Sequence, residues 1–164
     1  MAGRPIGLTG GIATGKSLVS GIFQAEGFIT ISGDQVAREV LVAGSAALED
    51  LAMAFGKKII TDTGELNRPV MLNVLLADPM NMECQLRILA PHLLPVIDQR
   101  VGILMTTHPD RKVLVEAPLL FEYDQAQRYS PIIVVTVPRE VQVQRLMDRS
   151  GQNRGWAESV IDLQ

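Results

Sequence analysis

The glycine-rich segment 10–17 contains the residue types that point most directly to chemistry. It reads GGIATGKS, so two glycines bracket four residues and are followed by Lys16 and Ser17. This is the G-x-x-x-x-G-K-[ST] spacing of phosphate-binding loops. Glycines let the backbone curl until successive N–H groups point at an anion. Lys16 is then expected to reach the β- and γ-phosphates of a nucleotide, and the Ser17 hydroxyl to meet Mg²⁺.

The flanking segments supply the expected structural context. An apolar run over 5–9 predicts a strand, and the pattern over 16–26 predicts a helix whose positive end adds to the field on a phosphate. Glycine-rich turns between a strand and a helix also occur without a ligand, but a lysine and a serine in register favour phosphate binding. The predicted nucleotide-binding residues are Gly11, Ile12, Ala13, Thr14, Gly15, Lys16 and Ser17.

Asp34 follows a second predicted strand, 28–31, and therefore belongs to the same rim of the sheet as the loop. Its carboxylate could take a proton from a substrate hydroxyl or hold a water on Mg²⁺. Asp34 could equally cap a helix beginning at Gln35. Arg38, four residues on, would share its helix face and could hold Asp34, bind a substrate phosphate or form a surface ion pair.

Further candidates lie in the second half of the chain. Glu116 ends a third predicted strand, where P-loop proteins place an acidic group near Mg²⁺. The rigid apolar segment 117–122 could line a substrate pocket or belong to the core. Arg145 and Arg149 are four apart on a predicted helix and could neutralise transferring phosphates, or face solvent.

Composition limits the class of protein. The 164 residues carry a net charge of −3 with a pI near 5.4, which argues against a nucleic-acid binder that relies on bulk charge. No run of about 18 apolar residues indicates a membrane span. The single Cys84 excludes an internal disulfide. We therefore expect a cytoplasmic protein without nucleic-acid or membrane partners, and the oligomeric state stays open.

Strand and helix patterns alternate along the chain, which predicts an α/β fold with a mainly parallel sheet. Further helices are expected over 35–42, 46–55, 70–76, 139–149 and 156–163. The helical pattern over 80–105 contains Pro91 and Pro95, so we expect two helices or a kink there. The unbroken apolar run 131–137 predicts a fourth strand that is covered on both faces.

Four segments in order resemble the dephospho-CoA kinases. They are 6–17 with its loop, GDQVAREV at 33–40, EAPLLFE at 116–122 and QRLMDRSG at 144–151. The resemblance extends over the whole chain and implies ATP-dependent phosphorylation of the ribose 3′-hydroxyl of dephospho-CoA, with Mg²⁺. It implies a three-layer α/β/α P-loop core over about 1–61 and 109–164, with a helical CoA-side insertion over about 62–108. It also implies that a C-terminal part of the domain lies beyond residue 164.

The resemblance also assigns roles to residues. Lys16, Asp34 and Arg149 become catalytic, with Asp34 as the base, while Ser17 becomes a contact of Mg²⁺ and Glu116 an indirect one. The substrate side takes Thr9, Asp34, Arg38, Leu119, Glu122 and Arg145. Ala13 replaces a usual loop glycine, which is tolerable if its φ stays negative, and Val160 replaces a common lid arginine. The alternatives are another small-molecule P-loop kinase and an ATP-binding remnant without transferase activity.

Overall fold

The computed structural model describes residues 4–117, 120–121 and 125–163, and the described residues form a parallel sheet between helices. The strands are β1 Ile6–Thr9, β2 Ile29–Ser32, β3 Val113–Glu116 and β4 Ile132–Val134. The helices are α1 Lys16–Ala25, α2 Gly33–Val40, α3 Ala46–Phe55, α4 Arg68–Ala77, α5 Pro79–Thr107, α6 Arg139–Ser150 and α7 Arg154–Asp162. Short 3₁₀ turns lie at Lys57–Ile59 and Ala126–Arg128.

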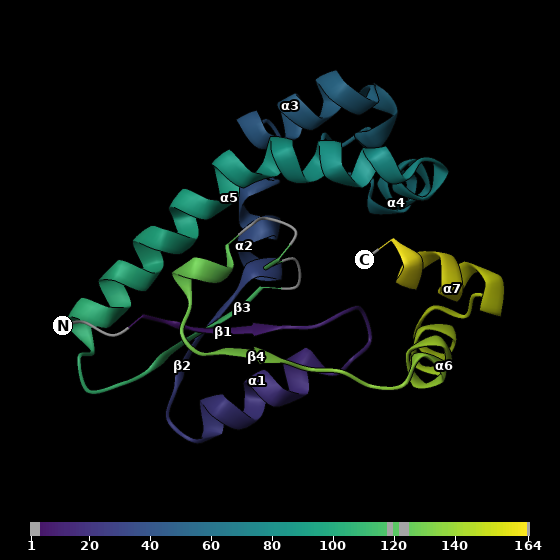
Figure 1. Cartoon of the computed structure of the whole chain (residues 1–164). Coiled ribbons are helices and arrows are strands. Elements are labelled where there is room, and N and C mark those ends of the chain that lie inside the picture. Colours follow the sequence, from purple (N-terminus) through teal and green to yellow (C-terminus); the bar gives the residue numbers. More distant parts are fainter. Residues whose placement is uncertain (1–3, 118–119, 122–124, 164) are drawn as a thin grey trace.

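The strand order is β2-β3-β1-β4, with every neighbouring pair parallel. Helix α1 packs under β1, β2 and β3, while α2 and α5 cover the other face (Figure 1). The predicted three-layer α/β/α arrangement is therefore confirmed. Leu8 and Leu114 are fully buried at its centre. Because parallel strands end at one edge, the residues that follow β1, β2 and β3 come together there.

Helix α5 follows the second of the two expectations, because it is one helix with a kink. It runs unbroken through Pro91 and Pro95, and Figure 1 shows it changing direction part-way along. A proline removes one backbone hydrogen bond and crowds the preceding turn, which bends a helix without ending it when the flanking turns are packed. Leu89, Leu93 and Ile97 supply that packing, because they are buried in the main core.

The same helix is long and apolar enough to cross a membrane by length and composition alone. The core helix of a soluble protein meets this criterion too, and α5 contacts α2, α3, α4 and the sheet. Within these contacts Leu89, Leu93 and Ile97 are buried, whereas Met80 and Ile103 of the same helix stay exposed.

The fourth strand is shorter and more exposed than its sequence predicts. β4 covers three residues and pairs with β1 at one edge of the sheet. Val134 is 51% exposed, so the expectation that both faces are covered is wrong. An apolar run indicates a strand, but it does not say whether the strand lies at the centre or the edge of the sheet.

Candidate active site

The phosphate loop (residues 10–17) joins β1 to α1 and lies against the chain that leaves β4. A side chain at Gly10 would place its Cβ 2.3 Å from the carbonyl oxygen of Val135, so only glycine fits there. Gly15 has φ +101° and forms the N-terminal cap of α1. Ala13 has φ +59°, in the left-handed region, so the condition under which alanine would be tolerated without strain, a negative φ, is not met. A non-glycine residue in this region carries about 1–2 kcal/mol of strain.

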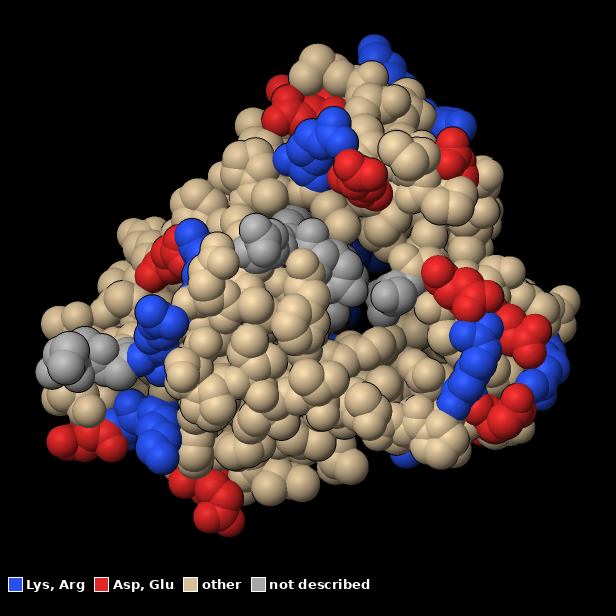
Figure 2. Space-filling model, viewed as in Figure 1, with Lys and Arg blue, Asp and Glu red and all other residues tan. Residues whose placement is uncertain are grey.

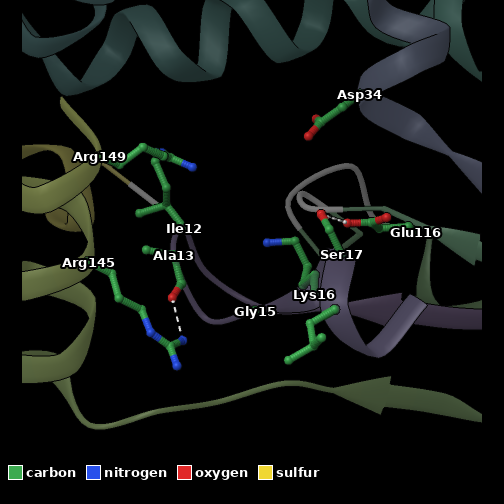
Figure 3. A pocket seen from close by; sticks show the side chains of 10 residues that line it. Ile12, Ala13, Gly15, Lys16, Ser17, Asp34, Glu116, Arg145 and Arg149 are labelled. Atoms are coloured by element: carbon green, nitrogen blue, oxygen red, sulfur yellow. Dashed lines mark hydrogen bonds between the residues drawn. The ribbon is translucent and has the colours of Figure 1, made fainter. Parts of the chain in front are cut away.

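Lys16 lies across the phosphate loop. Its Nζ donates to the carbonyl oxygens of Gly10 at 2.5 Å and Gly11 at 2.9 Å, and the Thr14 hydroxyl donates to Gly11 at 2.9 Å. Figure 3 shows the lysine amine directed into the pocket over the loop. A cation in this position can neutralise phosphate oxygens bound by the loop.

Ser17 and Glu116 meet beside the lysine. The Ser17 hydroxyl donates to Oε1 of Glu116 at 3.2 Å, and Glu116 is only 8% exposed (Figure 3). Glu116 reaches this position because it ends β3, the strand next to β1. A hydroxyl and a carboxylate oxygen next to a phosphate site are the ligand types that Mg²⁺ prefers.

Asp34 faces the same space from α2. The helix begins at Gly33, and Ser32 is its cap, accepting a hydrogen bond from the Gln35 N–H at 3.3 Å. The proposal that Asp34 caps a helix beginning at Gln35 is therefore wrong. Its carboxylate points into the pocket in Figure 3, opposite Arg149. Arg38, one turn later, is exposed, and no ion pair joins it to Asp34 among the described residues.

Helix α6 forms the other wall. Both arginines line the pocket: Arg149 points toward Lys16, and Arg145 reaches the phosphate loop from its other side (Figure 3). Arg145 Nη1 donates to the carbonyl oxygens of Ala13 at 3.0 Å and Thr14 at 3.2 Å. The two arginines that the sequence pairs therefore have different surroundings.

Together these groups line a polar cavity of about 350 Å³. A second, largely apolar cavity of about 220 Å³ lies between the sheet rim and α5, with Leu89, Leu93 and Arg68 among its lining residues. Asp34 lines both cavities. Figure 2 shows a hollow between the α3–α5 part and the α6–α7 pair, with Lys or Arg atoms inside it.

The remaining predicted site residues do not line the polar cavity or lie outside the described part of the chain. Thr9 is buried, at 3% exposure, at the end of β1. Leu119 and Glu122 lie outside the described residues. Sequence reasoning missed Gln142, whose Nε2 donates to the Ile12 carbonyl oxygen at 2.8 Å. The sequence did contain one indication: Gln142 lies three residues before Arg145 on the predicted helix, so both side chains share one helix face.

The α6–α7 pair has a small core of its own. Val143, Leu146, Ala157 and Val160 are buried together, and Ile12 and Ala13 of the phosphate loop pack against them. Val160, where the resemblance leads one to expect a lid arginine, is thus a core residue here.

Ion pairs on the surface hold the same two helices together. Arg154 of α7 bridges Glu140 of α6 at 2.6 Å, and Arg139 of α6 meets Asp162 of α7 at 2.7 Å, while a third pair, Arg154 with Glu158 at 2.8 Å, lies within α7. The hydrogen bond from Arg154 lowers the pKa of Glu140. Because the pair also packs on the loop, its position and the position of the loop are linked.

The chain is similar to known proteins over nearly its whole length. The family model for dephospho-CoA kinase matches residues 4–164. The dephospho-CoA kinase of Moorella thermoacetica is 37% identical over 159 residues, which cover 97% of this chain and 75% of that protein. The dephospho-CoA kinase of Arabidopsis thaliana is 34% identical over 165 residues, with 97% and 71% covered.

Solved structures share the fold. A crystal structure of a protein from Thermus thermophilus superposes with a TM-score of 0.74 at 26% identity, covering 99% of this chain and 80% of that one. The dephospho-CoA kinase from Campylobacter jejuni has the same fold, with a TM-score of 0.63 at 24% identity, and 98% and 79% are covered. The chain belongs to the dephospho-CoA kinase family.

Proposed function

We propose that this chain transfers the γ-phosphoryl group of ATP to the ribose 3′-hydroxyl of dephospho-CoA, the last step of coenzyme A synthesis. The observation that carries the proposal is the position of Asp34, on the wall of both the polar and the apolar cavity. A carboxylate at that junction can accept a proton from an acceptor in one cavity while a phosphate donor occupies the other.

The donor side is the polar cavity. The phosphate loop supplies backbone N–H groups, and Lys16 and Arg149 supply positive charge from opposite sides (Figure 3). In phosphoryl transfer the charge on the equatorial oxygens must be neutralised, and fixed cations do this without reorganisation.

The acceptor side is the apolar cavity between the rim and α5. Apolar side chains, chiefly leucines, form most of its wall, and Arg68 and Gln85 are among the polar residues that line it. We assign helices α4 and α5, which correspond to the insertion 62–108, to the acceptor side of a single domain, with 1–61 and 109–164 as its core. Arg38, exposed one turn beyond Asp34, is placed to meet an acceptor phosphate outside this cavity.

The reaction then needs one proton transfer and one displacement. The 3′-oxygen forms a bond to the γ-phosphorus while the bond from that phosphorus to the β–γ bridging oxygen breaks, releasing ADP. The Asp34 carboxylate takes the hydroxyl proton. Lys16 and Arg149 hold the transferring group in line and neutralise its charge.

Mg²⁺ fits the arrangement of Ser17 and Glu116. Both are oxygen donors in contact with each other at the end of the phosphate loop. Among the described residues no group of three or more His, Cys, Asp or Glu side chains could hold a metal by itself. That agrees with an ion bound mainly through phosphates and water. When bound, Mg²⁺ would supply charge neutralisation at the phosphates.

We place the protein in the cytoplasm, because its donor is ATP and its single Cys84 is a free thiol. A reducing compartment suits such a thiol.

The test is ADP release, measured with and without dephospho-CoA, together with mass spectrometry of the product. We expect release that depends on dephospho-CoA, a product heavier by one phosphoryl group, and a fall in rate of at least about 10²-fold in Lys16→Ala. Lys58→Ala, an exposed lysine outside the pocket, is the matched control and should retain full activity. Release that depends on a different small acceptor would indicate another P-loop kinase, and ATP binding without release would indicate an inactive remnant.

A further inference from the structure

Helix α6 contacts the phosphate loop through two side chains on one face. Gln142 Nε2 donates to the carbonyl oxygen of Ile12 at 2.8 Å. Arg145 Nη1 donates to those of Ala13 at 3.0 Å and Thr14 at 3.2 Å. The three carbonyl groups are consecutive, and all three accept hydrogen bonds from the same helix. One helix therefore holds the outer side of the loop.

The orientation of these carbonyl groups decides where the loop N–H groups point. In a trans peptide the C=O of one residue and the N–H of the next point in opposite directions. A donor that holds the Ile12 carbonyl outward therefore turns the Ala13 N–H inward. Arg145 does the same for the N–H groups of Thr14 and Gly15. Successive inward N–H groups are what makes a phosphate nest.

We infer that Gln142 is a positioning residue for the nucleotide, acting through the Ile12 peptide of the phosphate loop. The inference rests on the proposed function. Gln142 is half-buried and fits closely, since a Cβ at Gly11 would lie 3.1 Å from its Nε2. The peptide that it holds precedes Ala13, whose φ of +59° is strained. A strained peptide turns to another conformation unless its neighbours hold it.

The contact also links the loop to the opposite wall of the pocket. Arg149 lies on the same helix as Gln142 and lines the polar cavity. Val143 and Leu146 bury α6 against α7, with Leu72 and Leu76 of α4 packed beside them. A position of α6 that brings Arg149 to the phosphates is thus the position in which Gln142 holds the Ile12 peptide.

Gln142→Glu is the most informative variant, because it keeps the shape of the side chain and replaces the donating amide group with a carboxyl group. An ionised carboxylate cannot donate to the Ile12 carbonyl and repels it, whereas a protonated one can donate again. We expect ADP to bind about 10-fold more weakly than to the unaltered chain at pH 8, the effect of losing one buried hydrogen bond. The ratio of the ADP dissociation constant of Gln142→Glu to that of the unaltered chain should decrease toward pH 5, because the carboxyl group begins to protonate there.

Gln142→Leu removes the hydrogen bond without introducing a group that titrates, so it separates the loss of the bond from the pH dependence. It should weaken ADP binding by a similar factor at every pH, raise KM for ATP and leave KM for dephospho-CoA unchanged. The matched control is Gln144→Glu, on the same helix but exposed and bonded to Asp148. It should bind ADP as the unaltered chain does.

The outcomes separate this inference from the proposed function. ADP binding that is equal in the unaltered chain, Gln142→Glu and Gln142→Leu would overturn the positioning role alone. A deficit in Gln142→Glu that stays constant from pH 8 to pH 5 would also overturn it. An unaltered chain that neither binds ADP nor turns over would overturn the proposed function, and the inference with it.

Discussion

The Ser17 hydroxyl donates a hydrogen bond to Glu116 Oε1 at 3.2 Å, joining residues 99 positions apart in the sequence. The contact exists because β3 pairs with β1, with Glu116 opposite Leu8 in the register. It places a carboxylate at the first turn of α1, next to the phosphate loop. The proposed Mg²⁺ site at the end of the loop would therefore combine a hydroxyl from the first turn of α1 with a carboxylate from the end of β3.

Glu116→Gln tests the contribution of this carboxylate to Mg²⁺ binding. The amide keeps the size of the side chain and an oxygen that can accept from Ser17, but it removes the negative charge. We expect the apparent affinity for Mg²⁺ in the kinase assay to fall about 10- to 100-fold, as for other groups that orient metal ligands. ADP binding measured with EDTA should stay unchanged. An unchanged Mg²⁺ dependence would limit Glu116 to holding the serine.

Asp34→Asn tests the proposed base. It should lower kcat by about 10²- to 10⁴-fold, the range for loss of a general base, and leave ATP affinity unchanged within about 2-fold. Glu39→Gln is the matched control on the same helix, because Glu39 makes only surface contacts among the described residues, with Arg100 and Gln35. If Asp34→Asn lost ATP affinity in parallel with kcat, the carboxylate would instead be a ligand in the Mg²⁺ site.

Much of this site was predictable because its signals are local or topological. The loop at 10–17 combines residue type and spacing within eight positions, and the structure has the predicted strand and helix on either side. Asp34 and Glu116 were placed at one rim because parallel strands end together, and the register pairs Ser32 with Glu116.

The features that the sequence did not reveal depend on distant partners. Gln142 contacts a carbonyl oxygen 130 positions away, and nothing near Gln142 in the sequence specifies that atom. The positive φ of Ala13 occurs where α6 donates to the carbonyl oxygens on both sides of that residue, and Val134 is exposed on the edge strand β4. Such properties follow from tertiary packing, which overrides local preference.

The stability of the fold should fall at alkaline pH through Tyr129. Burial raises the pKa of this phenol, whose side chain packs beside Gly7. Because the unfolded chain loses the proton first, near pH 10, stability is fully present below about pH 10 and declines above it. The midpoint of urea unfolding should therefore decrease from pH 8 to pH 11, and Tyr129→Phe should decrease less. An equal decrease of the urea midpoint in the unaltered chain and in Tyr129→Phe would show that Tyr129 does not cause the loss of stability.

Ala13→Gly should stabilise the protein, against the usual effect of glycine. At φ +59° alanine carries about 1–2 kcal/mol of strain, and glycine removes it. Glycine also gives the unfolded chain about 0.4–1 kcal/mol more entropy to lose, so the net gain should be about 0.5–1 kcal/mol. The expected rise in Tm is about 1–4 °C.

Ala54→Gly provides the matched comparison, because Ala54 lies exposed inside α3, where helical φ is negative. It should lower stability by about 1 kcal/mol. Opposite signs at the two positions would assign the strain to the backbone of the phosphate loop. A loss at both would mean that the contacts of the Ala13 methyl group with the α6–α7 core outweigh the strain, since Ala13 packs against that cluster. Differential scanning calorimetry of the three proteins, without nucleotide, decides between these results.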